Sequence, residues 1–218
     1  MRRDLLLIGL FLAAFGALTV ALAAGGPLID LDLAVRGWSE SHRPRAAELA
    51  AETLNRLGQG GALLALSAAL AGVLALRRRS WWPLLYLGSA VVLLVPTVLA
   101  IKAVTQRGAP SSPLPPETTV ALMGPLPAGE YAAGYPSGHL VNAVVWYGVI
   151  LALATALLRA YGRGEPPAWL RRTVRVAPVV IVLITSTYLS FHWLTDGLAG
   201  LALGLAIDRA LHLVRWQR

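Results

Sequence analysis

Long apolar blocks, rather than apolar stripes of helical period, dominate this 218-residue chain. Hydrophobic residues make up 56% of the chain and charged residues only 14%, whereas soluble domains carry about 25% charged residues. Most of the blocks have the roughly 17–25 residues that cross about 30 Å of hydrocarbon as a helix. The pattern predicts an all-α polytopic membrane protein, a single six-transmembrane-helix bundle over residues 1–218, with spans at 5–24, 62–76, 82–101, 140–158, 174–191 and 194–211.

The first block has two interpretations. Arg2 and Arg3 precede it and alanines end it, as in a cleaved secretory signal. Its apolar run is longer than the usual run of about 7–15 residues in such signals. We therefore expect a retained membrane anchor.

The basic residues sort by side of the membrane. Thirteen of the 19 fall in segments on one side, and the positive-inside rule makes that side cytoplasmic: Arg2, Arg3, Arg77, Arg78, Arg79, Arg159, Arg163, Arg171, Arg172, Arg175, Arg209, Arg215 and Arg218. We expect a multi-pass protein of the cell membrane with both termini in the cytoplasm. This placement accounts for the net charge of +8 without nucleic-acid binding.

Residues 30–59 lie on the opposite, outer side. Apolar residues are spaced among charged ones there, which is typical of an amphipathic segment at a membrane surface. The chain has no cysteine, which excludes disulfides and thiolate metal sites, and its sequence shows no cluster of three metal ligands. We expect neither a metal nor a cofactor.

Five ionisable residues converge on the outer end of the predicted spans. His139 opens the fourth span, His192 closes the fifth, Asp196 lies one turn into the sixth, and Lys102 and Arg107 end the third. Ionisable residues at such positions are costly and tend to be functional. On a continuous helix His192 and Asp196 share a face, so the carboxylate is expected to hold the imidazole in one tautomer. For Lys102 and Arg107, anchoring at the lipid headgroups is an alternative role.

The segment from Pro136 to His139 has the features of a helix start. Proline stops what precedes it, and Ser137 is a suitable N-cap. Exposed backbone N–H groups at a helix start suit a phosphate. A simple turn and cap is the alternative, but it gives no reason for the histidine.

Two segments together resemble the type 2 phosphatidic acid phosphatase superfamily: Tyr135-Pro136-Ser137-Gly138-His139 and the stretch 185–196, which ends in His192-Trp193-Leu194-Thr195-Asp196. The resemblance covers about residues 102–204. It implies a metal-independent reaction in which His192 forms a phosphohistidine, Asp196 orients its imidazole, and His139 exchanges protons with the leaving group and with water. It also implies phosphate binding by Lys102, Ser137 and the Gly138 amide, at the outer face of the membrane.

Two arginines of the family pattern are missing. Ala109 occupies the arginine position of the first motif, and Ser186 that of the third. Arg107 is two residues from the first vacant position and is the candidate replacement, so we expect it to bind phosphate. No residue in the sequence obviously replaces the second arginine.

The leading functional hypothesis is a lipid phosphatase that hydrolyses a phosphate ester of a phospholipid or polyprenyl carrier. One alternative is a phosphotransferase that passes a phospho-headgroup to an alcohol, because a phosphodiester carries less charge and needs fewer arginines. Another is an inactive membrane scaffold or lipid transporter. The sequence leaves open which lipid is used, hydrolysis versus transfer, and the oligomeric state.

Overall fold

The computed structural model describes residues 1–124, 126–127 and 133–214, and every regular element in this part of the chain is helical. In chain order these are α1 (Arg2–Ala23), α2 (Pro27–Ser41), α3 (Arg45–Asn55), the 3₁₀-helix η1 (Arg56–Gly58), α4 (Gly60–Arg78), α5 (Trp82–Thr105), α6 (Pro116–Thr119), α7 (Gly138–Ala160), α8 (Ala168–Tyr188) and α9 (Leu194–Leu211). The predicted all-α class is confirmed. Arg215 and Arg218, which were counted toward the cytoplasmic side, lie outside the described residues.

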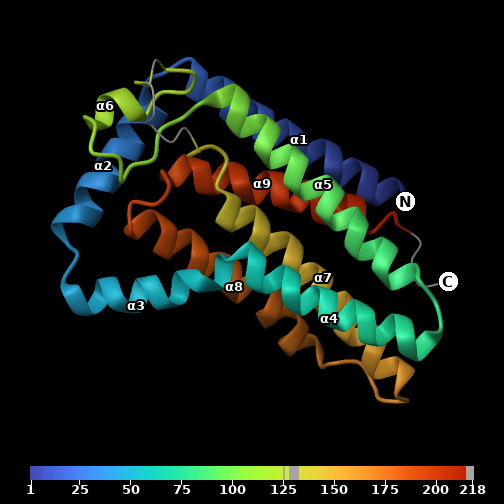
Figure 1. Ribbon diagram of the computed structural model, residues 1–218. Coiled ribbons are helices and arrows are strands. Elements are labelled where there is room, and N and C mark those ends of the chain that lie inside the picture. Colours follow the sequence, from blue (N-terminus) through green and yellow to red (C-terminus); the bar gives the residue numbers. More distant parts are fainter. Residues whose placement is uncertain (125, 128–132, 215–218) are drawn as a thin grey trace.

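The long helices run side by side, and the short ones gather at one end (Figure 1). Residue 1 and the end of α9 lie together at the other end. The predicted amphipathic segment at 30–59 is two helices, α2 and α3, joined by a turn and followed by η1. Pro27 starts α2 three residues earlier than expected, since proline suits the first helical turn.

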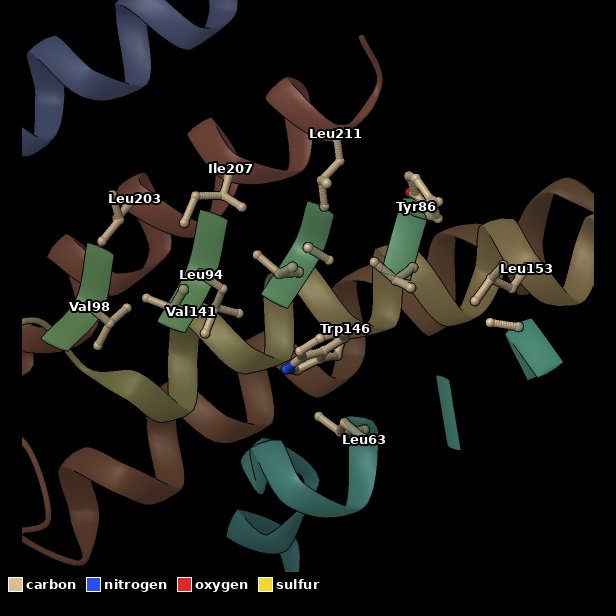
Figure 2. Packing of buried hydrophobic residues seen from close by; sticks show 14 of the residues in the cluster. Leu63, Tyr86, Leu94, Val98, Val141, Trp146, Leu153, Leu203, Ile207 and Leu211 are labelled. Atoms are coloured by element: carbon tan, nitrogen blue, oxygen red, sulfur yellow. The ribbon is translucent and has the colours of Figure 1, made fainter. Parts of the chain in front are cut away.

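Helix α7 forms the centre of the bundle. It packs against α4, α8 and α9, while α1 packs against α9 and α5 covers α4, α7 and α9. Figure 2 shows the core between these helices, where Leu94 and Val98 of α5 lie near Val141 of α7 and Leu203 of α9. Because α7 is enclosed on several sides, its first residues are held rigidly at the end of the bundle.

Within the described residues, four helices are long and apolar enough to cross a membrane: α1, α4, α5 and α7. The second predicted span, which was short at 62–76, is extended to 19 residues in α4. The other two predicted spans correspond to α8 and α9, which carry three charged residues each: Arg171, Arg172 and Arg175, and Asp196, Asp208 and Arg209. Six spans therefore remain a prediction.

Candidate active site

The predicted site residues meet at the end of the bundle where α2 and α3 lie. A cavity of about 690 Å³ opens there, and its lining includes Lys102 near the end of α5, Gly138 and His139 at the start of α7, and His192 in the turn between α8 and α9. The start of α4 completes the wall with Gly60 and its neighbours. Four segments that are far apart in the sequence thus share one cavity.

The two histidines face each other across a short distance. Their ring centroids are 5.7 Å apart, with the planes inclined at 66°. His192 is 8% exposed, and both rings line the cavity. A single phosphorus atom between them is within reach of a nucleophile on one ring and a proton donor on the other.

The tautomer of His192 follows from its hydrogen bond. Its Nδ1 lies 3.0 Å from the carbonyl oxygen of Gly134, and a carbonyl oxygen only accepts hydrogen bonds. Nδ1 therefore carries a proton, and in the neutral form of the ring Nε2 keeps its lone pair. The predicted direct bond to Asp196 is replaced by this one, because Asp196 Oδ2 is 3.7 Å from Nδ1, beyond hydrogen-bonding distance.

Asp196 is completely buried and contacts the turn that carries His192. Its Oδ1 accepts from Arg107 Nη1 at 2.6 Å, and its Oδ2 accepts the backbone N–H of Trp193 at 2.9 Å. The second bond caps the start of α9 and holds the turn that carries His192. Asp196 thus supplies negative charge near Nδ1 and fixes the local backbone.

Arg107 has a different place from the one expected. It is fully buried, and each of its three nitrogens donates to protein: Nε to the Val120 carbonyl, Nη1 to Asp196 and Thr195, and Nη2 to Asp32 at 2.7 Å. It does not line the cavity. The expectation that Arg107 binds phosphate is corrected, because its guanidinium is committed to the carboxylate that supports His192.

Lys102 does line the cavity, and its Nζ donates to the backbone carbonyl of Ala133. Ser137 caps α7 as predicted, since its Oγ accepts from the Leu140 N–H. Ser137 is fully buried and lies outside the cavity lining, whereas Gly138 is part of it. Among the described residues of the lining, Lys102 is the only lysine or arginine.

Tyr135, the first residue of the motif that begins α7, packs against α1. Its ring is buried against Phe15 with centroids 5.7 Å apart, and its hydroxyl is 2.6 Å from Thr19 Oγ1. Burial raises the pKa of Tyr135 to about 12, so the phenol stays neutral. The motif is thereby tied to α1.

A family model matches the part of the chain that carries these motifs. The model of the PAP2 superfamily matches residues 79–218, which contain both histidines, Lys102 and Asp196. This chain belongs to the PAP2 superfamily. The resemblance seen in the sequence is confirmed.

A solved PAP2 structure shows the same fold. The crystal structure of the first transmembrane PAP2 type phosphatidylglycerolphosphate phosphatase from Bacillus subtilis superimposes with a TM-score of 0.71. The alignment covers 97% of this chain and 95% of that chain, at 22% sequence identity. No curated protein sequence matches this chain significantly.

Asp32, on α2, lies outside the part of the chain matched by the PAP2 model and was missed in the sequence. It is buried, accepts from the Thr195 N–H at 3.0 Å, and pairs with Arg107. Burial raises the pKa of the Asp32 carboxyl, and the charge of Arg107 opposes this rise. The sequence signal was slight, an acidic residue between Leu31 and Leu33, two positions after Asp30.

The two vacant arginine positions of the PAP2 pattern differ in the structure. Ala109 lines the cavity. Ser186 is fully buried, and its hydroxyl donates to the Leu183 carbonyl at 3.4 Å. Only the first position points toward the space that a substrate would fill.

Proposed function

We propose that this PAP2 protein is a membrane lipid phosphatase that works through a phosphohistidine on His192. One observation carries the proposal: two histidine rings 5.7 Å apart border one cavity with Lys102, and the hydrogen bond from Nδ1 of His192 to Gly134 makes Nε2 the nucleophilic nitrogen of the neutral ring. A membrane fold makes a lipid phosphate the natural substrate.

In the first step, Nε2 of His192 attacks phosphorus and the bond from phosphorus to the leaving alkoxide oxygen breaks. His139 must carry a proton in the substrate complex, and it gives this proton to that oxygen, so the alcohol leaves neutral. The imidazole of His192 becomes positively charged, and the buried carboxylate of Asp196 stabilises it at 3.7 Å. Lys102 and the Gly138 amide stabilise the phosphoryl oxygens.

In the second step, water attacks phosphorus and gives a proton to His139. The bond between phosphorus and Nε2 breaks, phosphate leaves, and both histidines return to their starting states. The reaction uses no metal in this proposal. In support, the described residues hold no group of three or more His, Cys, Asp or Glu side chains placed to bind an ion.

Transfer to an alcohol is the second candidate. Lys102 is the one strong cation among the described lining residues, and a phosphodiester with one negative charge needs less positive charge than a dianionic monoester. The same phosphohistidine chemistry then ends with an alcohol in place of water.

Purified protein incubated with phosphate-labelled lipids separates these functions by thin-layer chromatography. Free phosphate indicates hydrolysis, a new labelled lipid indicates transfer, and neither product indicates a scaffold or transporter. His192→Ala should abolish turnover and the acid-labile phosphoenzyme. His139→Ala should slow turnover strongly, yet still form phosphoenzyme from a substrate with an activated leaving group.

Metal dependence is tested in the same assay. We expect full activity in excess chelator. Loss of activity that a divalent ion restores would contradict the metal-free reaction.

A further inference from the structure

Asn142 is a polar residue of the main cavity to which the proposed reaction gives no role. It lies on α7 three residues after His139, and both side chains line the cavity. Residues three apart on a helix are neighbours on one face. Helix α7 runs from the site end into the bundle (Figure 1), so Asn142 lies about 4.5 Å further along it than His139, at 1.5 Å per residue.

The orientation of the Asn142 amide follows from its hydrogen bond to Trp146. The indole Nε1 of Trp146 lies 3.2 Å from Asn142 Oδ1, and an indole N–H only donates. The atom that accepts must therefore be the amide oxygen, and the amide nitrogen, Nδ2, is directed elsewhere. Trp146 is 2% exposed and belongs to the main hydrophobic core. Core packing thus holds the amide in this orientation.

The Nδ2 of Asn142 lies against the start of α4. A Cβ added to Gly60 would be 2.5 Å from this nitrogen. The cavity wall there consists of residues 58–62, which are three glycines, an alanine and a glutamine, and none of them is charged. In the described part of the chain, Nδ2 has no hydrogen-bond acceptor. The cavity therefore contains a neutral donor that is free to bind a substrate.

The position of this donor beside His139 indicates which part of a substrate it contacts. In an in-line transfer the leaving oxygen lies opposite the nucleophile, so it lies on the side of His139 and away from His192. The atoms of the leaving alcohol continue from that oxygen, and Asn142 is the neighbour of His139 in the cavity lining. A cavity of about 690 Å³ holds a small molecule rather than a phosphate alone. A neutral donor here suits a neutral oxygen of the leaving group.

We infer that Asn142 selects a glycerolipid phosphate by donating from Nδ2 to an acyl-ester carbonyl oxygen of the leaving lipid. In such a lipid, two glycerol carbons separate the phosphoester oxygen from the nearest acyl-ester oxygen. The carbonyl therefore lies a few bonds beyond the oxygen that His139 protonates. A polyprenyl monophosphate has only hydrocarbon at this place and leaves the donor unpaired, which is unfavourable. The inference rests on the proposed function and names its substrate class.

Two phosphatidic acids that differ only in their linkages test this contact. One carries two ester-linked chains, and its diether analogue carries the same chains without carbonyl oxygens. A hydrogen bond between neutral groups corresponds to about a two- to tenfold change in rate, so the wild type should have a kcat/KM higher by this factor for the ester-linked lipid. Asn142→Leu keeps the approximate size of the side chain and removes the donor. This variant should use the two lipids equally well.

Gly60→Ala is a second variant, which keeps Asn142. Its Cβ would lie 2.5 Å from Nδ2, so the amide must shift, and the preference for the ester-linked lipid should be lost. The matched control is Gly72→Ala on the same helix, where an added Cβ meets no atom within 4 Å. It should keep the wild-type preference. Thermal unfolding of each purified variant checks that it is folded, and Gly60→Ala decides the question if Asn142→Leu does not fold.

Several results would overturn the inference and leave the proposed function standing. These are equal use of the two phosphatidic acids by the wild type, an unchanged preference in folded Asn142→Leu, and turnover of a polyprenyl phosphate or diphosphate without turnover of either phosphatidic acid. An equal loss of activity on both lipids in Asn142→Leu also overturns it, since the residue then acts on the phosphoryl group or in packing. Release of no phosphate from any of these lipids, or full activity of His192→Ala, overturns the proposed function and the inference with it.

Discussion

Arg107 and Asp196 form an ion pair in which both side chains are fully buried, with Nη1 2.6 Å from Oδ1. The second nitrogen of the same guanidinium pairs with Asp32 at 2.7 Å. One arginine therefore pairs with two buried carboxylates, one on α2 and one beside His192, the proposed nucleophile. The outer helices and the proposed reaction centre are joined at this point.

Removing Arg107 should unfold this corner. Arg107→Met leaves two buried carboxylates without a counter-charge, and breaking a buried pair in this way costs about 3–5 kcal/mol. We expect a markedly lower midpoint in thermal or denaturant unfolding of the purified protein. Arg45→Ala, which breaks an exposed pair, should leave the midpoint unchanged. Equal midpoints for the two variants would contradict the assigned role of Arg107.

Gly134 should tolerate no side chain. A Cβ at this position would lie 2.8 Å from the Gly108 carbonyl oxygen, 3.1 Å from that of Arg107 and 3.3 Å from Asp196 Oδ2. Gly134→Ala must therefore shift the carbonyl that accepts from His192, and a displacement of about 1 Å in a reacting group lowers rates about a hundredfold. Steady-state kinetics should show a lower kcat. Gly88→Ala, where an added Cβ meets no atom within 4 Å, is the control and should behave as the wild type.

An arginine introduced at position 109 should have a different effect from one introduced at position 186. Ala109→Arg adds a cation to the cavity lining and should strengthen vanadate inhibition and favour monoesters over diesters. Ser186→Arg places a charge in a fully buried position and should destabilise the protein, because an unpaired buried charge is costly. Inhibition constants and unfolding midpoints measure the two effects. Tighter vanadate binding by a stable Ser186→Arg variant would show that this position reaches the cavity.

The orientation in the membrane can be tested by labelling single introduced cysteines, since the chain has no cysteine of its own. We propose that the site end faces outward, because 13 of the 19 basic residues group on the predicted cytoplasmic side. Ser112→Cys should react with an impermeant thiol reagent on intact cells, and Arg163→Cys should react only after lysis. The reverse pattern would invert the orientation.

The sequence alone determined the properties that depend on local composition. Runs of apolar residues predicted the helices, because a membrane span must form its backbone hydrogen bonds within itself and can contain few charged residues. Ser137 was recognisable as the cap of α7 because capping involves residues three apart in sequence. The two histidines could be assigned to one end of the bundle by counting spans.

The tertiary structure decided which charges meet. Arg107 and Asp32 are 75 residues apart, and Arg107 and Asp196 are 89 apart. Their pairing depends on how α2 packs beside the start of α9. No local sequence pattern predicts that packing. Proximity in sequence made Arg107 appear to be the substitute phosphate ligand, and burial of its guanidinium between two carboxylates ruled that out. The choice of partner among the buried charges was therefore decided by the fold.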